Sequence, residues 1–346
     1  MRVGKWELGA SGGGGGGVQS RDVAQTRFRF APVEGPLLSS SLLRQLEQLE
    51  LVARRRSRSA GRGERRSRAR GQSVEFADYR NYVAGDDLRY LDWNLYGRLD
   101  RMFLKLYEEE RELPVQVFLD ASESMTFGVP TKFDFARRVA AALGYVALCG
   151  FDRVTVRVFP EPTPEADAGR GAPDGAGAAA EVAVRAALRG VRGKRAALTF
   201  FDNLARVRPG GPADFNEALR RAAIEVRQAG AAVVLSDLLD PRGYAAGLDA
   251  LVGRGFHLHV VQILAPEELQ PTTFGDLRVV DAETAAEQEV TFGKYRLKAY
   301  RQVVENYTQT LREFCRRRGI RFFRATSDTA IETLLLKELR QAAVLG

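Results

Sequence analysis

The feature that most constrains the fold of this chain is the regular alternation of short apolar runs with amphipathic helical patterns after residue 113. The first run, residues 114–119, ends at Asp120 and is typical of a strand buried on both faces of a parallel sheet. Helical patterns separate most of the runs. The alternation predicts an α/β fold in which helices cover both faces of a doubly wound, mostly parallel sheet. The later runs are 153–159, 231–236, 256–264 and 320–324.

Periodicity and composition predict the remaining elements. A helix is expected from Thr131, whose hydroxyl can cap free backbone amides, to about Gly150. Residues 160–181 are mostly Pro, Gly and Ala and are interpreted as a mobile loop, followed by a strand near 182–188. A small hairpin is expected around 277–291. The other expected helices are 39–52, 193–205, 213–229, 241–253, 294–318 and a last one after residue 324.

The excess positive charge of the chain is confined to one segment. Lys and Arg number 52 against 44 Asp and Glu, a net charge of +8, and residues 54–70 hold nine arginines and one acid. The rest of the chain is therefore neutral, which argues against a basic nucleic-acid-binding face. The segment is interpreted as a solvated linker, with weak binding to RNA, acidic lipid or an acidic protein as the alternative.

The sequence also indicates the cellular compartment of the protein and a division of the chain into three parts. Residues 1–36 contain a glycine tract and no apolar signal core, so a disordered tail is expected there. The longest apolar run, 139–151, is too short to cross a bilayer, and the two cysteines suit buried positions in a reducing environment. We expect a cytoplasmic protein with this tail, an N-terminal segment over 37–112 and an α/β domain over 113–346.

The N-terminal segment is rich in aromatic residues. Eight of them lie between Phe76 and Tyr107, more than so short a stretch can bury within itself, so we expect it to pack on the α/β domain. A turn at 85–87 is expected to begin a helix, with Asp side chains as caps. The charged residues here are interpreted as an ion-pair network at the docking contact, with a partner-contact surface as the alternative. These interaction residues are Arg80, Asp86, Asp87, Arg89, Asp92 and Trp93.

Two of the predicted strands end in acid and hydroxyl side chains. Asp120, Ser122 and Ser124 alternate after the first strand, and Ser236 and Asp237 end a later one. The carboxyl ends of parallel strands lie at one edge of a sheet, where ligand crevices form. Carboxylate and hydroxyl oxygens are hard ligands that suit Mg²⁺ or Mn²⁺. The sequence therefore predicts a divalent metal site at this edge.

Other chemistries find less support in the sequence. Ser122 and Ser124 lack a histidine base, because His257 and His259 lie together in one distant predicted strand. Those histidines have no nearby Cys to complete a zinc site and are expected to be structural. The glycine tract at 12–17 precedes no strand–helix unit and contains no Lys, so it is not a phosphate-binding loop. We therefore expect a protein that is not an enzyme.

A set of motifs is shared with a known family. The motifs are Glu75-Phe76, Tyr79-Arg80, Tyr82, Gly85-Asp86-Asp87, Arg89, Asp92-Trp93, Glu110-Arg111, Leu119-Asp120, Ser122, Ser124-Met125, Phe127-Gly128, Lys132, Ala136-Arg137, Ser236-Asp237, Asp281, Glu283-Thr284 and Cys315. With them the sequence resembles the von Willebrand factor type A domain with its metal-ion-dependent adhesion site, and more closely the bacterial family called domain of unknown function 58. The resemblance extends over residues 37–342 and implies the von Willebrand factor A-like fold.

The resemblance also implies a ligand set. In adhesion-type sites two serines contact the ion directly, strand-end aspartates act largely through water, and a threonine from a third loop completes the set. The serines and aspartates named above match these positions. The third loop corresponds to 208–219, where Ala213 stands at the threonine position, and the adjacent Asp214 is expected to compensate.

The function implied by the resemblance is the binding of a partner's acidic segment through the open position of the ion. Such proteins are thought to work beside MoxR-type AAA ATPases. The leading hypothesis is therefore a non-enzymatic interaction or adaptor protein with Mg²⁺ or Mn²⁺ as its cofactor. A metal-free interaction domain of the same fold is the first alternative. A metal-dependent hydrolase using Asp120, Asp237 and Asp214, and a nucleic-acid binder using residues 54–70, are the others.

Overall fold

The computed structural model divides into two units, and each is described by itself. The larger unit comprises residues 1–58 and 113–346, and the smaller comprises residues 59–112. The residues that the structure describes are 6–10, 36–49, 74–83, 88, 91–109, 112–161, 176–271, 275–281, 287–292 and 294–339.

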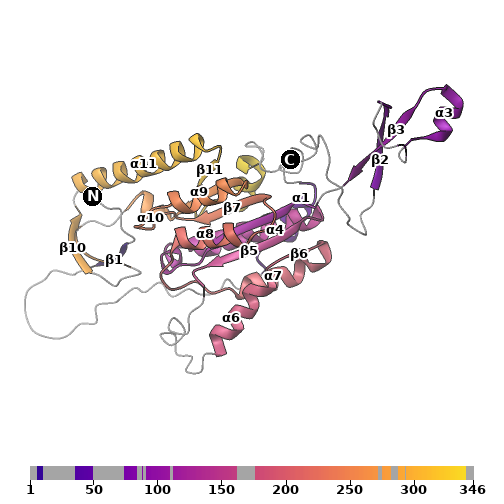
Figure 1. Ribbon diagram of the computed structural model, residues 1–346. Coiled ribbons are helices and arrows are strands. Elements are labelled where there is room, and N and C mark those ends of the chain that lie inside the picture. The colour runs from indigo at the N-terminus through magenta and orange to yellow at the C-terminus, as the bar shows by residue number, and fades with distance from the viewer. Residues whose placement is uncertain are drawn as a thin grey trace, which may run out of the picture. The chain divides into compact units, whose positions relative to one another are not determined.

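The centre of the larger unit is a six-stranded sheet in the order β11-β8-β7-β4-β5-β6 (Figure 1). Its strands pair in parallel, except that β6 is antiparallel to β5. The predicted α/β fold with a mostly parallel sheet is therefore confirmed. The strands are β4 (Pro114–Asp120), β5 (Arg153–Phe159), β6 (Val191–Arg192), β7 (Ala231–Ser236), β8 (His257–Leu264) and β11 (Arg321–Thr326).

The strand order reverses beside β4. Chain order runs outward from β4 to β5 and β6 on one side, and from β7 to β8 and β11 on the other. The connections that leave β4 and β7 therefore diverge, and a crevice is expected outside the carboxyl ends of these two strands. In the register, Val115 lies opposite Ala231 and Leu119 opposite Leu235, so β4 and β7 end side by side.

Helices bury both faces of this sheet. Alternate side chains of a strand point to opposite faces, and Val117 of β4 belongs to one apolar cluster whereas Phe118 belongs to another. The first cluster includes residues of α1 (Ser40–Leu46), α4 (Lys132–Cys149), α7 (Ala197–Arg206) and α12 (Ile331–Thr333). The second includes residues of α8 (Phe215–Glu225), α9 (Ala245–Gly253) and α11 (Lys294–Arg317).

Helix α4 lies against β4 and carries one side of the core. Thr131 caps it by accepting a hydrogen bond from the backbone N of Asp134 at 3.1 Å, as the sequence predicts. Its Ala-rich sequence lets both the sheet and α1 approach closely. Two hydrogen bonds hold α1 there, from Arg138 Nε to Leu37 O at 3.1 Å and from Tyr145 OH to Glu47 Oε1 at 2.7 Å.

Two predictions for the larger unit are wrong. Trp6–Ala10 form a strand, β1, which pairs with β9 (Gly275–Asp281). β9 in turn forms the predicted hairpin with β10 (Glu287–Phe292). Disorder therefore does not hold for these five residues, because an open strand edge can pair even with a short segment of a Gly-rich tail. The glycine tract itself lies outside the described residues.

Residues 176–187 are the second case. They form a helix, α6 (Ala176–Ala187), where the sequence predicted the end of a loop and a strand. Alanine is the strongest helix former, and the apparent period of two came from Val182 and Val184 alone. No helix in the described part of the chain is long and apolar enough to span a membrane.

The smaller unit is a hairpin with a helix. Strands β2 (Val74–Asn81) and β3 (Phe103–Glu109) pair antiparallel, and α3 (Trp93–Leu99) lies between them in sequence. Helix α3 begins at Trp93, later than the turn at 85–87 that was expected to start it, because Asp92 supplies the cap. The predicted segment 37–112 thus divides, since α1 belongs to the larger unit. Its docking on the α/β unit stays a prediction.

Candidate functional site

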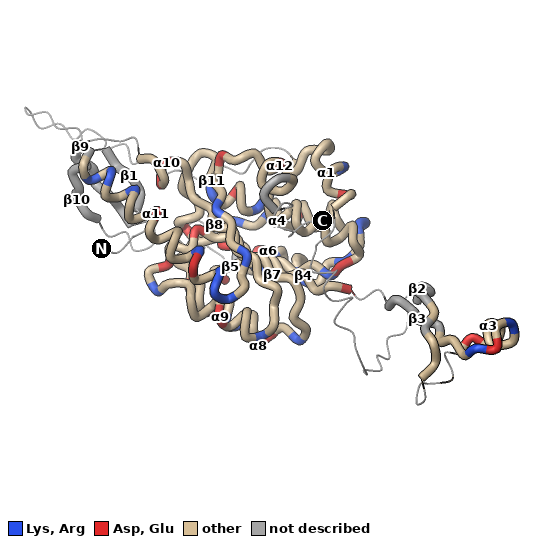
Figure 2. The backbone as a smooth tube through the Cα atoms, turned by 90° about the horizontal axis from the view of Figure 1, so that it is seen from above, with Lys and Arg blue, Asp and Glu red and all other residues tan. Residues whose placement is uncertain are grey.

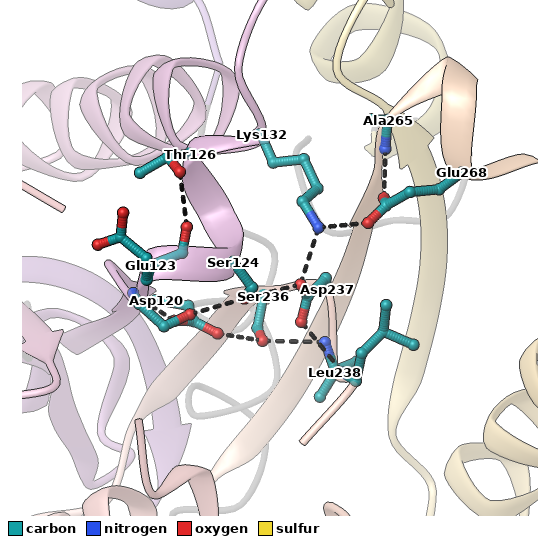
Figure 3. A network of polar contacts seen from close by, with 12 residues as sticks. Asp120, Glu123, Ser124, Thr126, Lys132, Ser236, Asp237, Leu238, Ala265 and Glu268 are labelled. Atoms are coloured by element: carbon teal, nitrogen blue, oxygen red, sulfur yellow. Dashed lines mark hydrogen bonds and ion pairs between the residues drawn. The ribbon is translucent and has the colours of Figure 1, made fainter. Parts of the chain in front are cut away.

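The candidate site lies where β4 and β7 end, at the point where the strand order reverses (Figure 3). Four residues that the sequence predicted here, Asp120, Ser122, Ser124 and Asp237, lie in one hydrogen-bonded network. All four side chains are buried. The structure therefore brings together the residues of two strand ends that are far apart in sequence.

Asp120, the last residue of β4, is held from two sides. Its Oδ1 accepts a hydrogen bond from the backbone N of Ser122 at 2.9 Å. Its Oδ2 accepts one from the hydroxyl of Ser236, the last residue of β7, at 2.6 Å. Hydrogen bonds to a carboxylate are directional, so these donors fix its orientation at the sheet edge.

The two serine hydroxyls lie beside each other in the turn that follows β4. This turn contains the 3₁₀-helix η2 (Glu123–Thr126). Ser122 Oγ and Ser124 Oγ are 3.0 Å apart, and Ser124 Oγ donates to Asp237 Oδ2 at 3.2 Å. The turn thus brings the Ser124 hydroxyl into contact with the carboxylate that follows β7, and the Ser122 hydroxyl into contact with that of Ser124.

Lys132, to which the sequence analysis gave no role, joins this network. It is the first residue of α4 and its side chain is 1% exposed. Its Nζ lies 2.9 Å from Asp237 Oδ2 and 2.7 Å from Glu268 Oε1 (Figure 3). Burial alone lowers the pKa of Lys132, but the two carboxylates outweigh it and hold the pKa above its usual range. Lys132 is therefore an ammonium group inside the site.

Glu268 comes from α10 (Pro266–Leu269), the short helix after β8. Its Oε2 accepts a hydrogen bond from the backbone N of Ala265 at 2.7 Å, at the start of the helix, while Oε1 contacts Lys132. Burial raises the pKa of Glu268, Lys132 opposes this rise, and the negative charge of Asp237 adds to it. Glu268 thus ties α10 to the network.

The network contains more acid than base. Asp120, Asp237 and Glu268 supply three carboxylates, and Lys132 supplies the one ammonium group in contact with them among the described residues. Buried carboxylates are costly unless they are paired or bind a cation. A divalent cation at this edge would lie among these carboxylates, as the ammonium of Lys132 does.

The chain leaves the site through a strained residue. Leu238, directly after Asp237, has φ of 59°, in the left-handed region that leucine rarely adopts. Its N donates to Ser236 Oγ at 3.0 Å, and its carbonyl accepts from the hydroxyl of Tyr307 on α11. The N of Leu239 donates to Asp237 Oδ1 at 3.0 Å. Strain that neighbouring contacts enforce in this way is characteristic of functional loops.

The predicted third loop lies against the first. The N of Gly210 donates to Ala121 O at 2.6 Å, and the N of Glu123 donates to Gly211 O at 3.1 Å. Ala213 is buried in the apolar cluster that includes α8 and has only a methyl group to offer. The loop is therefore positioned beside the site but brings no side-chain oxygen at the threonine position.

Asp214 is engaged elsewhere. Its Oδ1 caps α8 by accepting from the N of Glu217 at 2.9 Å, and its Oδ2 pairs with Arg242 Nη1 at 2.7 Å. Arg242 also donates to Ala213 O at 2.6 Å, which holds the start of α8. The described contacts of Asp214 thus place it in a helix cap and an exposed ion pair, and outside the network of Asp120.

The oxygens of the network fit part of the shell of a hard divalent cation. Neighbouring ligands of an octahedral Mg²⁺ bound at about 2.1 Å lie about 3 Å apart. The Ser122–Ser124 and Ser124–Asp237 oxygen distances, 3.0 and 3.2 Å, are of this size. No three His, Cys, Asp or Glu side chains of the described residues form a metal-binding group. An ion here would therefore depend on the two hydroxyls and on retained waters.

The interaction residues predicted in the N-terminal segment belong to the smaller unit. Asp92 accepts hydrogen bonds from the N of Asn94 at 3.0 Å and from Tyr79 OH at 3.0 Å, so it caps α3. Trp93 is 62% exposed and contacts Tyr96 edge-on. Arg80 lies in β2. The predicted ion-pair network otherwise concerns Asp86, Asp87 and Arg89, which lie outside the described residues.

The residues that sequence reasoning missed carry a weak signal. A positive charge at the first position of a helix is opposed by the helix dipole, so Lys132 in a buried helix start indicates an acidic partner nearby. Glu268 has no comparable signal, because Glu in the first helical turn is common. Only the fold shows that these two residues meet across 136 positions of sequence.

Comparisons with known proteins give a family and uncharacterised relatives. The model of the family described as "Protein of unknown function DUF58" matches residues 78–312. The chain is similar to uncharacterised proteins of Mycobacterium bovis and Mycobacterium tuberculosis, with 26% identity over 266 residues, covering 74% of this chain and 76% of theirs. It is also similar to the crystal structure of a conserved hypothetical protein, BatB, from Bacteroides thetaiotaomicron. That likeness has 16% identity and a TM-score of 0.36 and covers 67% of this chain and 99% of that one.

Proposed function

The chain belongs to the DUF58 family of proteins of unknown function, and from this premise we propose that it is a non-enzymatic protein-interaction module. It binds acidic segments of a partner protein at the carboxyl edge of its six-stranded sheet, through a divalent cation. The observation that supports this proposal is the contact of Ser122, Ser124 and Asp237 oxygens, at 3.0 and 3.2 Å, within a buried network at the ends of two strands.

The donor set suits adhesion more than hydrolysis. Ser122 and Ser124 would hold the ion, and Asp120 and Asp237 would act through water and orient the hydroxyls. Neutral hydroxyl ligands leave a cation with much of its charge, so it attracts a further carboxylate from outside. When bound, the ion supplies this electrophilic position. The chain's own residues hold the hydroxyls and carboxylates in place around it.

Neither the lysine of the described network nor either histidine is suited to act as a general base there, so a hydrolase would have to use one of the carboxylates. Lys132 stays protonated because its pKa is raised, and both histidines lie on β8. His257 is the first residue of that strand, at the edge opposite to the site, and His259 is two residues further on. These positions favour binding over catalysis, because a base must reach the proton that it abstracts.

One observation favours the metal-free alternative. The ammonium of Lys132 already contacts Asp237 and Glu268 and is itself a cation in the site. In this form Lys132 is the cation of the network, and the sheet edge serves as a preformed surface without a metal ion. The two forms differ in whether acidic partners need a divalent cation.

We expect the partner to be a MoxR-type AAA ATPase or its client, as the resemblance of the motifs implies. Affinity capture with the full chain, in parallel buffers containing Mn²⁺ and EDTA, tests this. Recovery of the ATPase from the Mn²⁺ buffer alone supports ion-mediated binding. A partner that instead leaves with rising salt and ignores EDTA indicates the arginines of 54–70 and nucleic acid or another polyanion.

Calorimetric titration of Mn²⁺ tests the metal directly. Wild type should bind weakly, Asp120→Ala should not bind, and Ala213→Thr should bind more tightly because it restores an oxygen next to the site. Melting temperatures of the three proteins serve as the control for folding. If wild type shows no heat of binding and Ala213→Thr shows no gain in affinity, the metal hypothesis is rejected and the metal-free alternative is retained.

A further inference from the structure

A cavity of about 410 Å³ lies on the other side of α10, and none of the network residues lines it. The end of α10, the first half of α11 and β11 form its walls. Its lining combines an apolar floor with a basic rim, and it includes Leu269, Gln270, Lys298, Arg301, Glu305 and Arg324.

One face of α11 supplies the rim. Residues 298, 301, 302 and 305 are spaced at three, four and seven positions, so they lie on one side of the helix. Val304 beside them is buried and closes the floor. This row extends over about 10 Å at 1.5 Å per residue. Figure 2 shows Lys and Arg recurring along α11.

The charges on this rim are not balanced. Arg324 pairs with Glu305, with Nη1 and Oε2 at 2.8 Å. Lys298 and Arg301 are exposed, and no ion pair joins either of them to another described residue. Two positive charges, one helical turn apart, therefore line the cavity without an ion pair to another described residue, whereas the carboxylate of the lining, Glu305, pairs with Arg324.

The cavity adjoins the candidate site through α10. Glu268 extends from this helix to Lys132, whereas the next two residues, Leu269 and Gln270, line the cavity. A chain that lies along the sheet edge passes from one site to the other across a single turn of helix.

We propose that this groove binds carboxylates of an acidic peptide segment and is a second anchor for the partner that approaches the ion site. The proposal rests on the proposed function. Acidic residues along an extended peptide can place one carboxylate against Lys298 and another against Arg301, which lie one helical turn apart. A compact phosphate that binds between the two cations is the competing ligand, and competition by inorganic phosphate distinguishes it.

The test uses a photo-crosslinkable peptide of eight alternating Glu and Gly residues, and the same peptide with Gln in place of Glu. The full chain is compared with the double variant Lys298→Gln/Arg301→Gln. The matched control is Arg316→Gln/Arg317→Gln, which removes the same charge at the far end of α11. Mass spectrometry of the crosslinked residues separates the groove from the arginines of 54–70.

We expect crosslinks within 294–317 for the Glu peptide, with a yield about threefold to tenfold lower in the double variant, since exposed ion pairs contribute modestly. The control variant and its melting temperature should be unchanged. Persistence of these crosslinks in EDTA, even if the Mn²⁺ titration fails, supports the groove and separates it from the ion. Equal loss in the control variant overturns the proposal. So does an equal yield with the Gln peptide, or full competition by millimolar inorganic phosphate.

Discussion

Lys132 is the residue on which the charge balance of the sheet edge depends. Its ammonium lies between Asp237 and Glu268, and all three side chains are largely or wholly buried. A buried ion pair contributes little net stability compared with apolar residues, but removing one partner leaves unbalanced charge. Lys132 therefore acts as an internal counter-ion, and its removal is expected to destabilise the fold.

We predict that Lys132→Met lowers the free energy of unfolding by about 3–5 kcal/mol, the usual cost of leaving a buried charge unpaired. Urea unfolding at neutral pH measures this. Lys132→Met/Glu268→Gln should recover part of the loss, because Asp237 is then the only carboxylate that has lost its contact with the ammonium of Lys132. A single variant as stable as wild type would contradict the role assigned to Lys132.

His259 gives the fold a dependence on pH. It is 7% exposed on β8, and burial, with the positive charge of Arg321 and then that of His257, lowers its pKa from 6.5 to about 4. Between these two values the unfolded chain binds the proton more readily, so stability falls as pH falls from 6.5 toward 4. Above pH 6.5 the contribution of His259 is fully present.

We predict a loss of about 3 kcal/mol from this group across that interval, at about 1.4 kcal/mol for each pH unit. Chemical denaturation at pH 7 and pH 4.5 should show a smaller difference for His259→Phe than for wild type. His257→Phe, in which the exposed neighbour is changed instead, serves as the control and should keep most of the wild-type difference, because burial is the largest cause of the lowered pKa of His259 and the charge of His257 the smallest. Identical pH profiles for all three proteins would rule out His259 as the cause.

At the scale of elements, the contact between α4 and α7 depends on one missing side chain. A Cβ built on Gly144 of α4 would lie 2.5 Å from Phe200 Cζ of α7. Phe200 is 1% exposed, so its ring has little room to move. Glycine in the middle of α4 is therefore explained by close packing, since it is otherwise unfavourable in a helix.

We predict that Gly144→Ala destabilises the protein by about 1–3 kcal/mol, the usual cost of overpacking a core, despite the better helix propensity of alanine. Gly253→Ala at the end of α9 is the matched control, because nothing lies within 4 Å of the added Cβ there. It should be neutral or slightly stabilising. Thermal unfolding of the two variants tests this prediction. A melting temperature of Gly144→Ala equal to that of wild type would refute the packing argument.

The elements differ in how far their sequence predicts them. β4 and β7 are predicted because strands buried on both faces are apolar throughout, and α4 because Thr131 and a long apolar pattern mark its start and course. Helix α6 is not predicted, because a few valines in an Ala-rich stretch resemble a strand pattern. Strand β1 is not predicted, because its partner strand lies more than 260 residues away.

The candidate site shows the same division. Asp120, Ser122, Ser124 and Asp237 are predicted because they follow strands whose ends must meet at one edge. The contact between Lys132 and Glu268 is not predicted from the sequence, because it depends on where α4 begins relative to the short helix after β8. Local patterns define the ends of elements, whereas contacts between those ends are set by the packed sheet.

At the scale of the whole molecule, the two units divide the chain in a way that proteolysis can follow. We predict that limited trypsin digestion cuts first among the arginines of 54–70 and spares 113–159, whose strands and helix are buried. If the aromatic-rich segment packs on the α/β unit, residues between Glu75 and Arg111 should also resist cleavage. Early cutting there, detected by mass spectrometry of the fragments, would contradict that docking.

The order of strands around β4 has a consequence for synthesis of the protein. Three elements of the sheet edge are synthesised in turn. β4 ends at Asp120, β7 is followed by Asp237, and α10 contains Glu268. A ribosome-bound chain that stops before α10 already contains Asp120, Lys132 and Asp237 and lacks Glu268. The complete network can therefore form only after α10 has been synthesised.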